Sequence, residues 1–249
     1  MHRKPTMKSN ASINVAGALF ITALFTGHVL PADGPSLEQI DLFQSGTDDY
    51  HTYRIPSLLV TKQGTVLAFG EGRKSGPGDE GDIDIVLKRS ADGARTWSDM
   101  QIIADDGEHT MGNPCPVLDD RSGTIWLSLC RDNKRVLFMK STDDGGTWSE
   151  PVEAANEVMI PEWEWIGTGP GHGIQLTTGR LVIPCWAGKG PALCGNVQAS
   201  FVIYSDDGGT TWKRGATLDR DASDECEVVE RVDGSLYMNM RSRQDKRQR

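Results

Sequence analysis

The chain has 249 residues, and its 26 lysine and arginine side chains against 35 aspartates and glutamates give a net charge of −9 at pH 7. This balance argues against a nucleic-acid binder, because such proteins need a basic face that displaces the counterions of the phosphates. Hydrophobic residues make up 37% of the chain and charged residues 24%, so we expect a folded core rather than disorder.

The first 32 residues are typical of a signal peptide. Basic residues precede an apolar run at Val15–Phe25, and Leu30-Pro31-Ala32 ends on the small residue that a cleavage site needs. The run is short for a membrane span. We therefore expect residues 1–32 to be removed, leaving a domain at 33–249 that is secreted or periplasmic and has no integral membrane span. A retained N-terminal anchor is the alternative.

After this leader, short apolar runs alternate with turn signals such as Lys62-Gln-Gly and Asp233-Gly. No stretch shows a sustained helical period with caps. The sequence therefore predicts an all-β fold. The expected strands, in chain order, are Ser57–Val60, Thr65–Phe69, Ile83–Leu87, Thr124–Leu129, Arg135–Met139, Arg180–Pro184 and Phe201–Tyr204.

Three octapeptides share the pattern Ser-x-Asp-x-Gly-x-Thr-Trp. They are Ser90–Trp97, Ser141–Trp148 and Ser205–Trp212, and they begin 51 and 64 residues apart. The first octapeptide has Ala94 where the other two have glycine. Such spacing is close to one four-stranded propeller blade for each repeat.

Each octapeptide is expected to form a compact hairpin with a structural role. Its aspartate can accept backbone N–H groups, its glycine permits a positive φ, and its tryptophan can fill the core of the blade. An EF-hand calcium loop is excluded, because the alternating oxygen ligands and the closing glutamate are missing. The residues concerned are Asp92, Trp97, Asp143, Trp148, Asp207 and Trp212.

This pattern resembles the Asp boxes (BNR repeats) of sialidases, also called neuraminidases. Further segments narrow the resemblance, which runs from about Tyr53 to the C-terminus. These are Tyr53-Arg54-Ile55-Pro56, the Gly112-Asn-Pro-Cys-Pro-Val and Gly169-Pro-Gly-His-Gly-Ile-Gln-Leu runs, and Glu225–Arg241. Asp boxes occur alone in other propellers, whereas this ordered set is specific.

The resemblance implies a six-bladed β-propeller and an exo-α-sialidase that removes terminal sialic acid from glycoproteins, gangliosides or oligosaccharides with retention, without a metal or an organic cofactor. The roughly 217 residues after Ala32 fit only about four blades. We interpret the chain as the N-terminal part of a longer protein, with a truncated product that lacks part of the active site as the alternative, and expect it to be inactive alone. The alternatives are a non-catalytic Asp-box propeller that binds glycans or acts as a scaffold, and a glycosidase for neutral polysaccharide.

Arginines suit a sialoside, because its carboxylate can be held bidentately by a planar guanidinium. The resemblance implies a triad of arginines, of which Arg54 and Arg241 match two members. Arg54 lies in an otherwise apolar strand, where an unpaired cation would be costly. The nearby cations Arg243, Lys246 and Arg247 compete with Arg241 for this assignment.

Arg73 matches another sialic acid-binding arginine of the family, and an ion pair with Glu71 or Asp79 is the alternative interpretation. The family's acid/base aspartate lies on a mobile loop ten residues before a basic residue, and Asp79 stands ten before Arg89. The neighbouring acids Glu80, Asp82 and Asp84 are alternatives. Asp82 and Asp84 alternate in a predicted strand, so we expect them on one face of it.

Sialidases use a tyrosine nucleophile, which avoids bringing a carboxylate up to a centre that already bears one. Glu225 matches the base that deprotonates this tyrosine, and Glu227 and Glu230 are alternatives. Strand alternation puts Glu225 and Glu227 on the same face, so the pattern does not separate them. The chain contains Tyr50, Tyr53, Tyr204 and Tyr237, and none of them matches the nucleophile, which falls later in the family's fold.

Five cysteines have no spacing typical of a zinc site. Cys115, Cys130 and Cys185 lie in apolar runs, and we expect them to pack as small buried hydrophobes. In an exported protein pairing is possible, with one cysteine left over.

Overall fold

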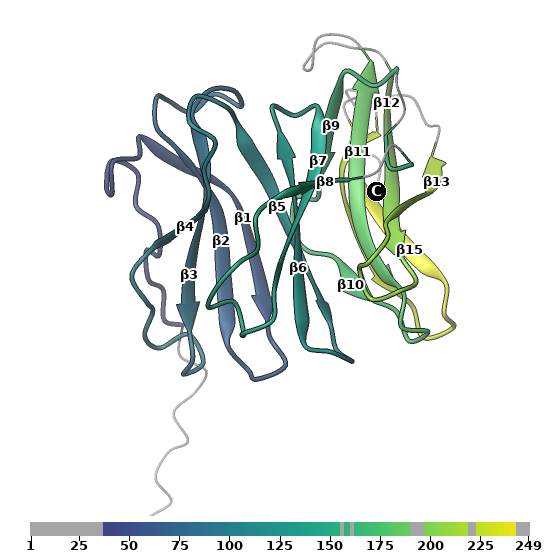
Figure 1. Cartoon of the computed structure of the whole chain (residues 1–249), viewed down its shortest axis with the longest axis horizontal. Helices are drawn as coiled ribbons and strands as arrows, with labels where there is room; N and C mark the ends of the chain where they lie inside the picture. The colour runs from purple at the N-terminus through teal and green to yellow at the C-terminus, as the bar shows by residue number, and fades with distance from the viewer. Residues whose placement is uncertain (1–36, 155–156, 160–161, 190–196, 219–222, 243–249) are drawn as a thin grey trace, which may run out of the picture. The chain divides into compact units, whose positions relative to one another are not determined.

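The computed structural model describes residues 37–154, 157–159, 162–189, 197–218 and 223–242, and the strands belong to one unit, Asp41–Arg249 (Figure 1). The predicted signal peptide, Cys194 and the competing cations Arg243, Lys246 and Arg247 lie outside the described residues. The described residues form strands and no helices, which confirms the predicted all-β fold. That part contains no helix long and apolar enough to cross a membrane.

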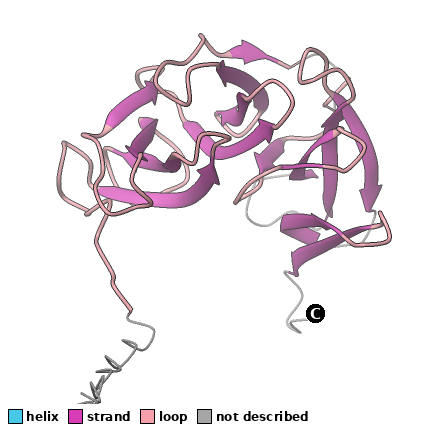
Figure 2. Cartoon of the chain, turned by 90° about the horizontal axis from the view of Figure 1, so that it is seen from below, coloured by secondary structure: helices cyan, strands magenta, loops and turns pink. Residues whose placement is uncertain are grey.

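The strands form a series of antiparallel meanders (Figure 2). The first sheet pairs its strands in chain order: β1 (Thr52–Val60), β2 (Val66–Arg73), β3 (Ile83–Ser90) and β4 (Gln101–Ala104). The second repeats this order: β5 (Met111–Asp119), β6 (Thr124–Arg131), β7 (Arg135–Ser141) and β8 (Val152–Glu153).

The third sheet divides its first strand into two pieces that both pair with β11. Its strands are β9 (Trp165–Thr168), β10 (Ile174–Gln175), β11 (Leu181–Lys189), β12 (Val197–Ser205) and β13 (Lys213–Leu218). A two-stranded sheet follows, made of β14 (Ser223–Glu230) and β15 (Leu236–Ser242). Three repeated meanders and a hairpin confirm the predicted propeller fold, and every predicted strand is present.

Two apolar clusters join successive sheets. One cluster is shared by the first and second sheets and includes Leu67, Phe69 and Leu127, all with no exposed surface. The other is shared by the second and third sheets and includes Val117 and Phe201. Burial of one such side chain contributes about 1.5–3 kcal/mol, so these clusters contribute strongly to the packing of one sheet on the next.

The cysteines of the described residues confirm the predicted packing role. Cys115, Cys130, Cys185 and Cys226 are free and buried. Burial raises the pKa of the Cys130 and Cys226 thiols to about 12, so they remain neutral and unreactive in the ordinary pH range.

The three Asp boxes have the same geometry and the same place, between the last two strands of each of the first three sheets. In each box the serine hydroxyl donates to the aspartate at 2.8 Å, and the threonine hydroxyl donates to the other carboxylate oxygen at 2.7 Å. The backbone N–H of the box threonine also donates to the aspartate, and together with the threonine and serine hydroxyls it lowers the pKa, to about 2 for Asp143 and Asp207. The pKa of Asp92 is lowered in the same way.

The sequence predicts that each box tryptophan fills the core of its own blade. The structure corrects this prediction, because two of them pack against the preceding sheet. Trp212 stacks on Phe138 of the preceding sheet with ring centroids 4.4 Å apart, and Trp148 contacts the edge of Phe69 at 5.8 Å. Trp97 has no preceding sheet among the described residues. It is partly exposed and donates to the carbonyl of Ala94. The boxes therefore act mainly as wedges between neighbouring sheets.

This wedge geometry predicts opposite effects for two exchanges at equivalent box positions. Ala94 has a φ of +68° and Gly145 a φ of +78°. A Cβ on Gly145 would lie 2.9 Å from both methyl groups of Leu67, so Gly145→Ala adds a clash to backbone strain and should destabilise by about 3 kcal/mol. Ala94→Gly only relieves strain and should stabilise by about 0.5 kcal/mol.

Urea unfolding of the two variants checks this pair of effects. Ala94→Gly should raise the midpoint of the transition and Gly145→Ala should lower it strongly. Equal shifts, or a destabilised Ala94→Gly variant, would contradict the wedge arrangement.

Candidate active site

The side chain of Arg54 is placed by an irregularity in β1. The register of β1 against β2 shifts between Arg54 and Ser57, so Ile55 and Pro56 together oppose Gly70. Ile55 has a φ of +50°, a conformation that is rare for a β-branched residue. Bulges of this kind redirect side chains and are common beside active sites.

The same irregularity recurs in two other strands that carry sequence motifs. In β5 the register shifts between Gly112 and Cys115, where Asn113 has a φ of +56°. In β14 it shifts between Ser223 and Cys226, at the position of Glu225. A repeated bulge therefore marks the candidate site in three sheets.

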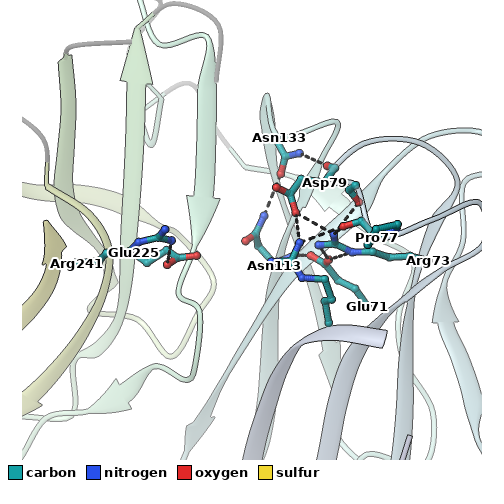
Figure 3. A network of polar contacts seen from close by, with 10 residues as sticks. Glu71, Arg73, Pro77, Asp79, Asn113, Asn133, Glu225 and Arg241 are labelled. Carbon is teal, nitrogen blue, oxygen red and sulfur yellow. Dashed lines mark hydrogen bonds and ion pairs between the residues drawn. The ribbon is translucent and has the colours of Figure 1, made fainter. Parts of the chain in front are cut away.

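Asp79 lies between two arginines of the first sheet, Arg54 and Arg73, and Figure 3 shows it beside Arg73. Its Oδ1 atom accepts from Nη1 of Arg54 at 2.8 Å and from Nη1 of Arg73 at 2.9 Å. The side chains of Arg54 and Asp79 are 44% and 37% exposed, so both remain accessible to a ligand. The structure thus brings together three of the residues that the sequence selects.

Arg73 shows the ion pairing that the sequence left open as an alternative. Its side chain is 2% exposed and donates through Nε to Glu71 at 2.9 Å, besides contacting Asp79. It also donates to the carbonyls of Pro77 and Gly78, at 2.7 Å each. Burial raises the pKa of Glu71, and Arg73 opposes that rise. Arg73 holds the loop that bears Asp79, and direct contact with substrate stays a prediction.

Two asparagines of the second sheet complete this network, and the sequence interpretation missed both. The backbone N–H of Asn113 donates to Oε1 of Glu71 at 2.7 Å. The Asn113 amide donates to Oδ1 of Asn133 at 3.0 Å, and Asn133 donates to the main-chain carbonyl of Asp79 at 3.0 Å (Figure 3). The signal for Asn113 was its place before a proline, which repeats the Ile55-Pro56 pair at the bulge.

Glu225 and Arg241 form a second pair, on β14 and β15 (Figure 3). Nη1 of Arg241 donates to Oε2 of Glu225 at 2.6 Å, and this bond raises the pKa of Arg241. The side chains are 55% and 30% exposed, so the pair is open to solvent. Nε of Arg241 also lies 3.9 Å from the fully buried carboxylate of Asp224.

The other two candidate bases have different surroundings. Glu227 lies against the Gly171 backbone, where a Cβ would be 1.4 Å from its Oε1, and it accepts from the N–H of His172 at 3.3 Å. Burial raises the pKa of Glu227. Glu230 accepts from the N–H and hydroxyl of Thr177 at 2.8 and 2.9 Å. Among these three acids, a described contact with an arginine is found only for Glu225.

The alternative acids near Asp79 also differ from it. Asp82 and Asp84 do share one face, because both contact Nζ of Lys74, at 2.8 and 3.0 Å. Asp84, however, is fully buried and accepts from the hydroxyl of Tyr50 at 2.6 Å. Desolvation raises the pKa values of both Tyr50 and Asp84. Glu80 is exposed.

None of the described tyrosine contacts is suited to a nucleophile beside Glu225. Tyr50 is buried against Asp84, and Tyr53 donates to the carbonyl of Thr47 at 3.2 Å. Tyr204 lies under the guanidinium of Arg180, and Tyr237 is 54% exposed on β15. In the described residues, no group of three or more histidine, cysteine or acidic side chains is arranged to hold a metal ion.

Repeated meanders with a common hairpin box, and arginines placed beside carboxylates at bulges, define a propeller of the Asp-box class. The family model described as a BNR repeat-like domain matches residues 64–249. The chain is 34% identical over 230 residues to an exo-alpha-sialidase of Aspergillus fumigatus, covering 78% of this chain and 53% of the relative. It is 37% identical over 223 residues to sialidase-3 of Bos taurus, covering 76% and 51%.

Solved structures agree with these relatives. The microbial sialidase Hz136 superposes with a TM-score of 0.73 at 28% identity, over 80% of this chain and 44% of that one. Trypanosoma rangeli sialidase superposes with a TM-score of 0.64 at 20% identity, over 78% and 35%, which supports the fold. The chain belongs to the sialidase family with Asp-box (BNR) repeats. It spans about half the length of the curated relatives it matches.

Proposed function

We propose that the full-length protein is an exo-α-sialidase that releases terminal sialic acid from sialylated glycans with retention, outside the cytoplasm. The observation that carries this proposal is the position of Asp79. Its carboxylate is held by Arg54 and Arg73, and the guanidinium of Arg54 is accessible to a ligand. The sialidase relatives supply the substrate class.

The residues have separate roles in this proposal. Arg54 and Arg241 hold the substrate carboxylate, since both guanidinium groups are about half exposed. Asp79 protonates the leaving oxygen and later deprotonates water. Glu225 accepts the proton of a tyrosine nucleophile, which we place in the part of the relatives' length that this chain does not span.

Carboxylate recognition by Arg54 predicts a sharp effect of Arg54→Lys. The lysine keeps the charge but replaces a bidentate fork with a point charge, so affinity for a sialic acid analogue should fall by about tenfold or more. Isothermal titration calorimetry measures it. Arg135→Lys is the matched control. Arg135 is also an exposed arginine paired with a carboxylate, Glu153, but this pair lies on the second sheet, whereas Arg54 lies on the first.

Unchanged affinity in Arg54→Lys would contradict the role of Arg54. If Arg54→Lys loses affinity but the unmodified full-length protein does not hydrolyse sialosides, the result would instead favour a glycan-binding propeller without catalysis. Hydrolysis of a fluorogenic sialoside, measured beside the titration, separates these two functions.

A further inference from the structure

We propose that Asn133 is a positioning residue for Asp79, which it holds by the main chain from the neighbouring sheet. The proposal rests on the proposed role of Asp79 as the acid. It concerns a residue that belongs to neither the Arg54 pair nor the Glu225 pair, and that the sequence motifs do not include.

Asn133 lies in the turn between β6 and β7, and its own side chain is buried there. It is 2% exposed and, like Asp132, has a φ of +51°, a conformation that asparagine tolerates better than most residues. A buried amide is costly without partners. Its Nδ2 donates to the carbonyl of Asp79 and its Oδ1 accepts from Asn113, each at 3.0 Å.

The turn itself is anchored to two sheets. The N–H of Asp132 donates to the carbonyl of Thr110 at 2.9 Å, and the N–H of Thr110 donates to the Asp132 carboxylate at 3.1 Å. The carbonyl of Asn133 accepts from the N–H of Ile166 at 2.7 Å. The amide of Asn133 therefore projects from a backbone that cannot easily shift.

The loop at residues 74–82 joins β2 to β3 and has a second anchor close by. The hydroxyl of Thr110 accepts from the N–H of Gly81 at 3.0 Å and donates to its carbonyl at 2.8 Å. Asn133 and Thr110 thus hold the main chain at Asp79 and Gly81, whereas Arg73 holds it at Pro77 and Gly78. Arg54 and Arg73 are also the two groups that hold the carboxylate of Asp79.

This division of contacts matters once a substrate binds. When Arg54 turns to the substrate carboxylate, Asp79 loses one of its two arginine contacts. The main-chain anchors then keep the acid within reach of the leaving oxygen. A displacement of about 1 Å can cost about 100-fold in rate, so a buried amide at this place affects protonation of the leaving group in particular.

The test replaces Asn133 with glycine, which keeps the left-handed backbone and removes the amide. Asp49→Gly is the matched control, because Asp49 is exposed and has a φ of +64°. In the full-length protein, Asn133→Gly should lower kcat for a lactose-linked sialoside about tenfold and for a nitrophenyl sialoside about twofold or less. KM for both substrates should change little, and Asp49→Gly should leave both rates unchanged.

A second readout does not depend on turnover. Amide hydrogen exchange at Asp79–Gly81 should be faster in Asn133→Gly than in the unmodified protein or in Asp49→Gly. Asn133→Asp, which keeps the acceptor for Asn113 but loses the donor to Asp79, should show the same increase. Unchanged exchange in the folded variants, or equal loss of rate for both substrates, would overturn the role of Asn133.

Asp79→Asn, measured in parallel, separates this inference from the proposed function. If Asp79→Asn shows no dependence on the leaving group, the assignment of the acid fails. If Asp79→Asn shows that dependence and Asn133→Gly does not, only the positioning role fails.

Discussion

Asp79→Asn should lower turnover of a sialoside with a poor leaving group by about 10²–10⁴-fold, and turnover of a nitrophenyl sialoside by about tenfold or less. The amide can still accept from Arg54 and Arg73, so the loop should keep its place, but it has no proton to give to the leaving oxygen. A nitrophenolate leaves without protonation, and its rate should therefore depend little on the acid. Steady-state kinetics with the two substrates give both values.

Glu80→Gln is the control for this variant, because Glu80 is the exposed neighbour that the sequence offered as an alternative. It should alter both rates by about twofold at most. If Glu80→Gln shows the dependence on the leaving group and Asp79→Asn does not, the acid has been assigned to the wrong residue.

Glu225→Gln should slow both substrates by about 10²–10⁴-fold, because it disables activation of the nucleophile, which every leaving group requires. The variant also removes the charge that Arg241 contacts at 2.6 Å, so binding of the substrate carboxylate should not weaken. A fall in kcat with little change in KM is the expected pattern.

Glu227→Gln is the matched control for Glu225→Gln, since both acids lie on β14 and both side chains are partly exposed. Glu227 contacts the N–H of His172 rather than an arginine, and its variant should keep most of the activity. A large loss in Glu227→Gln with a small one in Glu225→Gln would show that the base is Glu227.

These two carboxylates show where sequence reasoning reaches its limit. Alternation along a strand places Glu225 and Glu227 on the same face, so the pattern alone could not choose between them. The distinction comes from residues far away in the chain. Arg241 reaches Glu225 from β15, whereas the segment at Gly171 and His172 covers Glu227.

Burial was also hard to predict from local pattern. Alternation in the predicted strand correctly placed Asp84 on the same face as Asp82. It did not predict that Tyr50, from the segment before β1, encloses the carboxylate of Asp84. Arg73 is enclosed in the same way by Glu71 and by the carbonyls of its own loop. A contact between distant segments decides the burial of Asp84, and the path of the loop after β2 decides that of Arg73.

The fold itself was largely predictable, because three Asp boxes report three repeats of one meander. The boxes did not reveal that Trp148 and Trp212 pack on the sheet before their own, since an octapeptide carries no information about its neighbours in space. Nor did the motifs reveal that bulges recur at Arg54, Asn113 and Glu225, where register depends on the partner strand.

The most direct test of the account is the anomeric form of the first product released by the full-length protein. Proton NMR during hydrolysis of a sialyllactose follows it in time. In the proposed mechanism the anomeric carbon is attacked first by a tyrosine that Glu225 activates and then by water that Asp79 activates. Two such displacements predict that α-sialic acid forms first and then mutarotates to the β form. Release of β-sialic acid first, or no release at all, would contradict the account.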